Sequence, residues 1–324
     1  MSNILFKRVF AGAALIVCSA LGAAADITVA VALTPLTAPF FVAEKQGFFN
    51  DEGLQVVIKE CSGGNVCLKQ LLDGQVDLAT ASDLPIMFRS FERKDHYVLA
   101  TFATSNRDMQ LIARKSAGIK TVKDLEGKRI GLVRGTSGQY FLDLATLAAG
   151  LDPRSLNISD LDLKDLEQAA ANRQVDAFSV WEPHAYKISR LLGDDAIRLT
   201  VAGLYSLSFN LIALRGPNGL ADGDQVKFLR ALDKAILFMK AQPASTRAIL
   251  QQRLKLESSE IDTFWPNYRF GLTLNQSLLS TLESEARWAI REQFVKGTRV
   301  PDYLDFLEVG PLKQVRPSAV TLVK

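Results

Sequence analysis

The chain has 324 residues, of which 48% are hydrophobic and 23% charged, and it contains three cysteines. An apolar fraction of this size supports one or two buried cores, so the composition excludes a disordered chain, a collagen-like repeat and a disulfide-dense miniprotein. The formal net charge is +3 and no run of basic residues is present. We expect no nucleic-acid partner, because binding to a phosphate backbone requires a concentrated basic surface.

Residues 1–25 have the pattern of a cleaved secretory signal peptide. Lys7 and Arg8 precede an apolar run, residues 9–21, which is followed by three alanines. A transmembrane anchor is the alternative, but the run is shorter than the roughly 20 residues that span a bilayer. A lipid anchor on Cys18 is a weaker alternative. Cleavage removes two basic residues and no acidic one, which lowers the net charge to +1. We therefore expect an exported protein of the Gram-negative periplasm.

Residues 26–108 alternate short apolar strands with helices, which is typical of a parallel-sheet α/β fold. A proline in the first turn and a glycine after the last turn delimit the first helix, residues 39–46. Asp83 can cap a later helix. The strands expected in this block are residues 27–33, 55–59, 76–80 and 97–103.

A second alternating block starts near residue 110. We expect its strands at residues 110–113, 129–133, 156–159, 175–180 and 196–201, and its helices at residues 138–149, 163–171 and 183–192. Beyond residue 208 the pattern changes to one strand, residues 209–214, followed by helices at residues 225–241, 245–254, 258–265 and 278–295.

A helical tail with one strand cannot easily build a sheet of its own, so we expect it to pack on the first block. Domain I would then be discontinuous, with residues 26–108 and 211–324, and domain II would contain residues 109–210. The chain would cross twice between the domains, and two crossings side by side indicate a hinge.

The sequence contains no convincing catalytic or metal-binding motif. The segment GTSGQYF, residues 135–141, lacks the lysine of a P-loop and the spacing of a nucleophile elbow. Only two histidines are present, and we interpret His184 as a solvated surface residue. We therefore expect a protein that is not an enzyme and has no cofactor and no bound metal.

Four loops that each join a strand to a helix are the candidate binding elements. They are residues 34–39 and 81–85 in the first block, and residues 135–140 and 181–184 in the second. In open α/β sheets such loops meet at one edge, where the unpaired N–H groups of helix starts suit an anion or oxyanion. Ordinary helix capping is the alternative for any single loop. Trp181 is a candidate aromatic wall, with a core position as its alternative.

Three charged residues lie near these loops. The four loops would line both walls of a cleft between the two domains. Asp83 and Glu182 would bring negative charge to this cleft, although each could serve as a helix cap. Arg107 is the candidate countercharge, with a surface salt bridge as its alternative. If both acids face the ligand, a solute that carries an amine or amidine is favoured over a simple inorganic anion.

Two cysteines, Cys61 and Cys67, remain after removal of the expected signal peptide. In an oxidising compartment such a pair usually closes as a disulfide. A metal site and two free thiols are the alternatives, and the scarcity of histidine disfavours the metal site.

Five segments resemble periplasmic substrate-binding proteins of ABC importers, in the group that contains the nitrate, sulfonate, taurine and THI5-like (thiamine-pyrimidine) proteins. The segments are KQGFFNDEGLQV (45–56), LLDGQVDLATAS (71–82), TVKDLEGKRIGLVRGTSG (121–138), RQVDAFSVWEP (173–183) and VPDYLDF (300–306). The resemblance extends from about residue 27 to residue 309. It implies a bilobal type II α/β fold that closes on a small ligand, and it implies a membrane permease and a cytoplasmic ATPase as partners.

The resemblance also implies a set of ligand-binding residues, to which Arg107 is added for its place at a crossing. The set is Thr34, Pro35, Phe40, Ser82, Asp83, Arg107, Thr136, Ser137, Gly138, Gln139, Trp181 and Glu182.

We expect a monomeric importer component that captures a small polar organic solute of the nitrate, sulfonate, taurine or aminopyrimidine type. Asp83 stands where sulfonate-type relatives often have a small polar residue, which disfavours simple sulfonate or nitrate. One alternative is a secreted enzyme on the same fold, a pyrimidine- or menaquinone-pathway relative. It is disfavoured because the cysteine-rich motif of the eukaryotic pyrimidine synthases is missing from this sequence. Another alternative is a receptor that serves a membrane sensor.

Overall fold

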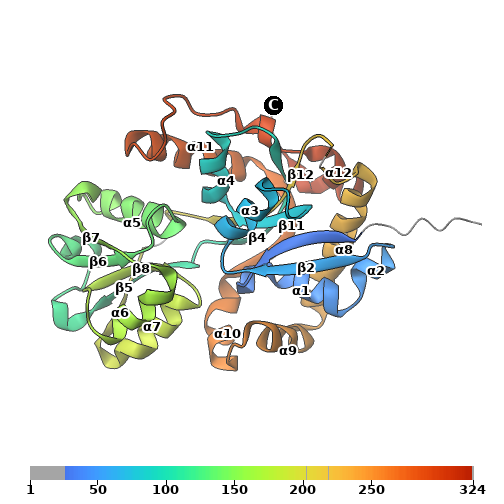
Figure 1. The fold of residues 1–324 in the computed structure, drawn as a ribbon. Coiled ribbons are helices and arrows are strands. Elements are labelled where there is room, and N and C mark those ends of the chain that lie inside the picture. The colour runs from blue at the N-terminus through green and yellow to red at the C-terminus, as the bar shows by residue number, and fades with distance from the viewer. Residues whose placement is uncertain (1–25, 202, 218, 323–324) are drawn as a thin grey trace, which may run out of the picture.

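The computed structural model describes residues 26–201, 203–217 and 219–322, so the expected signal peptide lies outside the described residues. The chain forms two lobes, and each lobe is built on its own β-sheet (Figure 1). The strand order is β12-β11-β4-β10-β3-β1-β2 in the first sheet and β7-β6-β8-β5-β9 in the second. The predicted bilobal α/β fold is confirmed. Among the described residues, no helix has the length and apolar composition needed to cross a bilayer.

The first lobe contains both ends of the described chain. Its strands are β1 (Ile27–Ala32), β2 (Val56–Cys61), β3 (Leu78–Ser82), β4 (His96–Ser105), β10 (Leu207–Leu214), β11 (Tyr268–Asn275) and β12 (Val320–Thr321). Its α-helices are α1 (Ala38–Lys45), α2 (Phe48–Asp51), α3 (Gly64–Leu72), α4 (Asp83–Ser90), α8 (Asp222–Ala241), α9 (Pro243–Leu254), α10 (Ser258–Phe264), α11 (Gln276–Arg291) and α12 (Val309–Val315).

The second lobe, green to yellow in Figure 1, is smaller. Its strands are β5 (Met109–Arg114), β6 (Arg129–Leu132), β7 (Asn157–Asp160), β8 (Ala177–Trp181) and β9 (Ala196–Leu199), and its α-helices are α5 (Ser137–Ala148), α6 (Leu166–Ala171) and α7 (His184–Leu192).

Both sheets are mixed, so the predicted parallel sheet is only partly correct. Strand β1 is parallel to β2 and β3, and β6 is parallel to β7 and β8. Strand β10 is antiparallel to β3 and β4, and β5 is antiparallel to β8 and β9. Strand β5, by which the chain enters the second lobe, and β10, by which it returns, are thus antiparallel to their neighbours, and so is β11 to β4.

The C-terminal region contains more strand than the sequence analysis predicted. Strand β11 pairs with β4, and β12 pairs with β11. The segment YRFGLTLN, Tyr268–Asn275, alternates apolar and other residues with the period of a half-buried strand. These strands complete the first sheet, so this region packs on the first block.

Two neighbouring strands of the first sheet carry the chain between the lobes. Strand β4 leads to β5 through residues 106–108, and β9 leads to β10 through residues 200–206. Ser105 at the end of β4 pairs with Leu207 at the start of β10, so the two crossings lie side by side. The boundary predicted between residues 210 and 211 falls inside β10, because the strand joins the first sheet from residue 207 onward.

The lobes also contact each other away from the crossings. The indole Nε1 of Trp288 on α11 donates a hydrogen bond to Oδ2 of Asp143 on α5, at 2.8 Å. The hydroxyl of Tyr186 on α7 donates to the hydroxyl of Ser259 on α10, at 3.1 Å. The second lobe is therefore held to the first through two different helix pairs.

Phe40, which was expected to contact ligand, lies in the core of the first lobe, and this part of the prediction is wrong. Its side chain is 0% exposed. The ring packs edge-on against Phe102, with 4.8 Å between centroids, and lies 6.2 Å from the ring of Phe228 on α8. Phe40 thus fixes α1 between the sheet and α8.

Substitution Phe40→Ala is expected to lower the free energy of unfolding by about 3–5 kcal/mol, because it leaves a cavity in a closely packed core. Phe294→Ala is the matched control, since Phe294 is 39% exposed. The free energy of unfolding should fall markedly less in this variant. Urea denaturation measures both values. Equal losses would contradict the placement of Phe40 in the core.

Candidate functional site

A cavity lies between the two lobes. Apolar and aromatic side chains of Leu36, Trp181 and Phe209 form part of the wall. The wall residues of the first lobe are Ala32, Leu33, Thr34, Leu36, Ser62, Gly63, Gly64, Asn65, Ser82, Pro85, Leu207 and Phe209. The first crossing and the second lobe contribute Asp108, Met109, Gly135, Thr136, Ser137, Trp181, Glu182, Pro183 and His184.

Four α-helices, α3, α4, α5 and α7, have their first turns at the cavity. The first four N–H groups of an α-helix have no partner inside the helix, so these starts offer donors to a bound solute. Each of the four predicted loops contributes residues to the wall. Residues 62–65 form a fifth loop that the prediction did not include. Its Gly64 allows α3 to approach the sheet, because a Cβ there would lie 2.9 Å from Cα of Ala81.

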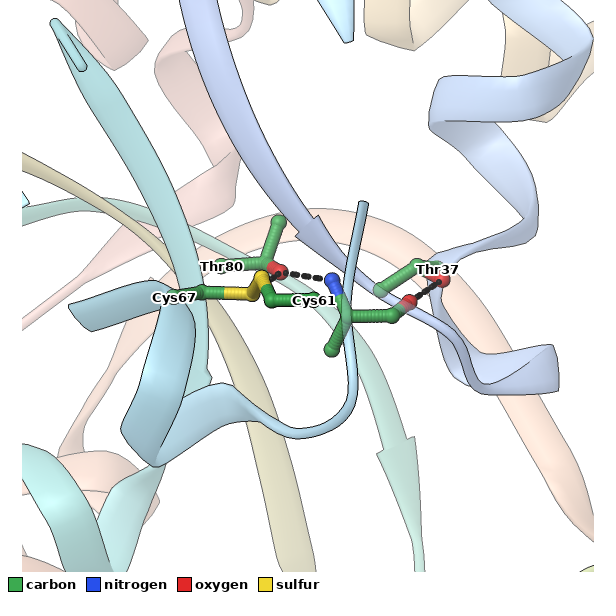
Figure 2. Close-up of a disulfide and its surroundings, with 5 residues drawn as sticks. Thr37, Cys61, Cys67 and Thr80 are labelled. Carbon is green, nitrogen blue, oxygen red and sulfur yellow. Dashed lines mark hydrogen bonds between the residues drawn. A yellow bond between two sulfur atoms is a disulfide. The ribbon is translucent and has the colours of Figure 1, made fainter. Parts of the chain in front are cut away.

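A disulfide between Cys61 and Cys67 brackets this fifth loop, with 5.7 Å between the two Cα atoms (Figure 2). The hydroxyl of Thr80 on β3 donates to Sγ of Cys67 at 3.9 Å and accepts from the backbone N–H of Ala32 at 3.0 Å. Thr37 donates to the carbonyl of Ala32 at 2.7 Å. The disulfide therefore sits in a hydrogen-bonded network that joins the cavity loop to β1 and β3.

Part of the predicted binding set lines the cavity, namely Thr34, Ser82, Thr136, Ser137, Trp181 and Glu182. The other members lie elsewhere. Pro35 is buried in the short 3-10 helix Pro35–Thr37, and Arg107 is exposed at the first crossing. For these two residues the prediction of a cavity position is wrong.

Gly138 and Gln139 shape the cavity wall from behind rather than lining it. A Cβ on Gly138 would lie 2.8 Å from the carbonyl oxygen of Ser179 on β8. The Ser179 hydroxyl donates to the Gly138 carbonyl at 2.6 Å, which holds α5 against the strand. Oε1 of Gln139 accepts from the N–H of Gly135 at 2.9 Å and closes the loop.

Asp83, another predicted ligand residue, is fully buried and serves as a structural acceptor. Its Oδ1 accepts from the Tyr205 hydroxyl at 2.5 Å, and its Oδ2 accepts from the N–H of Ser208 at 2.9 Å. Burial raises the pKa of Asp83 to about 6, against the opposing effect of these hydrogen bonds. The carboxyl thus fastens the start of α4 to the second crossing and to β10.

Glu182 lines the cavity, but its charge is already balanced. Oε1 accepts from the guanidinium of Arg198 on β9 at 2.9 Å, and Oε2 accepts from the N–H of Tyr186 at 2.8 Å. The carboxylate therefore caps the first turn of α7, which was the alternative that the sequence left open for this residue.

The sequence analysis missed two titratable residues of the cavity wall, Asp108 and His184. Asp108 is 2% exposed, and its Oδ1 accepts from the Tyr268 hydroxyl at 2.8 Å. Burial raises the pKa of Asp108 to about 7; the hydrogen bond from Tyr268 opposes this rise, and the nearby charge of Glu182 adds to it. The predicted crossing was the sequence signal for this region, but the prediction chose the neighbouring Arg107.

His184 was expected to be a solvated surface residue, and this prediction is wrong. The imidazole is part of the cavity wall, where its ring lies edge-on to Trp181 with 6.0 Å between centroids. Its Nδ1 lies 3.2 Å from Oε1 of Glu167. Burial lowers the pKa of His184, against the opposing effect of Glu167.

Residues 34–246 match the family described as NMT1/THI5 like. The chain belongs to this family. A Bacillus subtilis protein named for the binding of aliphatic sulfonates is 26% identical over 235 residues, which cover 69% of this chain and 70% of that protein. A pyrimidine phosphate synthase of Schizosaccharomyces pombe, 4-amino-5-hydroxymethyl-2-methylpyrimidine phosphate synthase, is 32% identical over 123 residues, 37% of this chain and 34% of the enzyme.

Solved structures of periplasmic binding proteins share the fold of this chain. The aliphatic sulphonate binding protein SsuA of Escherichia coli superposes with a TM-score of 0.74 at 18% identity, over 87% of this chain and 96% of that one. The alkanesulfonate-binding protein SsuA of Xanthomonas axonopodis pv. citri, bound to MOPS, superposes with a TM-score of 0.73 at 18% identity, over 88% of this chain and 98% of that one.

Loss of the disulfide is expected to lower the free energy of unfolding by about 2 kcal/mol, the entropic value for a short closed loop. Guanidinium denaturation with and without dithiothreitol measures this difference. A variant with both Cys61→Ser and Cys67→Ser is the matched control, because the reductant should not change its stability. A wild-type protein whose stability is equally insensitive to the reductant would contradict the prediction.

Substitution Gly138→Ala is expected to destabilise the protein by roughly 1–3 kcal/mol, because the added Cβ meets the Ser179 carbonyl. Gly223→Ala is the matched control. Gly223 is also the second residue of an α-helix, but a Cβ there would meet nothing within 4 Å. The control should be neutral or stabilising by up to about 1 kcal/mol. Similar effects of both substitutions in urea denaturation would refute the assigned role of Gly138.

Proposed function

We propose that the protein is the solute-binding component of an ABC importer and that it captures a small polar organic solute between its lobes. The observation that carries this proposal is the cavity with walls from both lobes. Its apolar and aromatic side chains, Leu36, Trp181 and Phe209, suit the carbon skeleton of an organic sulfonate or an aminopyrimidine better than a nitrate ion. We therefore place the solute in the sulfonate, taurine or aminopyrimidine class.

The arrangement of the lobes supports capture by closure. The two crossings lie side by side in neighbouring strands, which permits rotation of one lobe against the other about a single line. A solute that contacts both walls stabilises the closed arrangement over the open one, and it is then shielded from water. Thr34, Ser82, Thr136, Ser137 and Trp181 are the wall residues that we assign to solute contact.

The proposed partners are a membrane permease and its ATPase, which would receive the solute. Relatives that are named as periplasmic binding proteins support this assignment, as does the signal-peptide pattern of residues 1–25. We place the mature protein in the periplasm. A role as a binding protein is favoured over an enzyme because two relatives that are named as pyrimidine phosphate synthases match 37% and 41% of this chain, whereas the Bacillus subtilis relative named for sulfonate binding matches 69%.

At least one member of a panel of alkanesulfonates, taurine and aminopyrimidines is expected to raise the melting temperature of the mature protein. Isothermal titration calorimetry then gives its affinity. Trp181→Ala should weaken that affinity by about tenfold or more, because it removes an aromatic surface from the cavity wall.

Phe238→Ala is the matched control for this experiment. Phe238 is a half-buried aromatic residue on α8 that packs on Phe48, with 6.0 Å between ring centroids, and it is not part of the cavity wall. Its loss should leave the affinity unchanged. If no solute of the panel or of a wider library stabilises the wild type, the proposed function is wrong.

A further inference from the structure

The charged side chains of the cavity wall are acidic. Asp108 and Glu182 are present, His184 is the remaining titratable group, and no lysine or arginine lines the wall among the described residues. A cavity for a simple anion would be expected to present a cationic side chain, because charge-assisted hydrogen bonds to anions come most often from arginine and lysine. The charge of this wall instead favours a ligand with a positive group.

The two acids differ in how well the protein balances them. Arg198 neutralises Glu182 at 2.9 Å. Asp108 has no cationic partner within the part of the chain that the structure describes, and its side chain receives a single hydrogen bond, from Tyr268. A buried carboxylate without a countercharge is strongly unfavourable, and such a group is neutralised by a proton or by a cation that enters the site.

Asp108 is held in position from both lobes. The Tyr268 hydroxyl on β11 of the first lobe binds its Oδ1, while its backbone carbonyl accepts from the N–H of Glu182 at 3.2 Å in the second lobe. The other carboxyl oxygen accepts no hydrogen bond within the described residues, and Asp108 lines the cavity. The same cavity also contains Trp181, whose ring face can contact a cation.

We propose that Asp108 binds a positively charged nitrogen of the solute, so that this protein selects small organic compounds with an ammonium or amidinium group. The inference rests on the proposed function and narrows its ligand class. The unpaired N–H groups at the helix starts of the cavity wall would bind an acidic group of the same solute, where the solute has one. The expected ligand class is thus cationic or zwitterionic, in contrast to plain alkanesulfonates.

Two matched pairs of probes test this proposal. Taurine and isethionate share an ethanesulfonate skeleton and differ in an ammonium against a hydroxyl group. 4-Amino-2-methylpyrimidine and 2,4-dimethylpyrimidine differ in the amidine nitrogen. Calorimetry on the mature wild-type protein should show at least about tenfold tighter binding of one nitrogen-bearing member than of its partner. Asp108→Asn should abolish that preference, because the amide keeps the volume and the bond from Tyr268 but loses the charge.

The affinity of the wild type for taurine, whose ammonium group stays charged over this range, should rise between pH 5.5 and pH 8, as Asp108 becomes ionised. Three other titratable groups lie near Asp108. Glu182 is paired with Arg198, burial raises the pKa of Tyr268 well above its usual value, and the pKa of His184 is below its usual value. Asp108→Asn should therefore lose most of the pH dependence, which a purely structural role would not predict.

Asp143→Asn is the matched control, since Asp143 is another buried acid that accepts one hydrogen bond from an aromatic residue, Trp288, and it is not part of the wall. This variant should retain the wild-type preference. Binding of isethionate or 2,4-dimethylpyrimidine by the wild type with no preference for the nitrogen-bearing member in either pair would overturn the proposal while leaving the proposed function intact. Failure of every solute to bind would overturn both. A preference that survives Asp108→Asn would also overturn the role of Asp108.

Discussion

The antiparallel pairing of β4 with β10 is the constraint on which the rest of this structure depends. Because Ser105 lies opposite Leu207, the chain leaves the first lobe and returns to it at one place in the sheet. The cavity opens at the same place, since Asp108, Leu207 and Phe209 belong to its wall. The hinge and part of the site are therefore the same few residues, and a rotation of the lobes necessarily changes the shape of the cavity.

Buried carboxyl groups gather at this junction, and each is stabilised differently. Asp83 has a folded-state pKa of about 6, above its ordinary value, so ionisation of its carboxyl destabilises the fold as pH rises through that range. The hydrogen bonds from Tyr205 and Ser208 offset part of this cost. Burial and the charge of Asp83 also raise the pKa of the neighbouring Glu285 well above its usual range. Asp108 accepts one side-chain hydrogen bond, from Tyr268, and it lines the cavity, whereas Asp83 and Glu285 do not.

The sequence predicted the elements of this fold better than it predicted the direction of individual side chains. Strand-to-helix loops are visible because glycine, proline and capping residues mark them, and all four predicted loops contribute to the cavity wall. Within one loop, however, Ser82 lines the wall while Asp83 is buried in the opposite direction. The difference depends on Ser208, whose separation from Asp83 by 125 residues leaves no local pattern in the sequence.

Dependence on contacts between distant residues also explains why the sequence analysis did not identify Asp108 although it selected the neighbouring Arg107. Arg107 and Asp108 are adjacent charged residues at a crossing, and only the return of β11 beside β4 distinguishes them. Tyr268 pairs with Ser105 in that strand, and its hydroxyl then reaches the Asp108 carboxyl. A strand from the far end of the chain thus determines which charge faces inward. The position of Asp108 in the cavity wall is consequently determined by tertiary contacts, which composition and spacing alone do not contain.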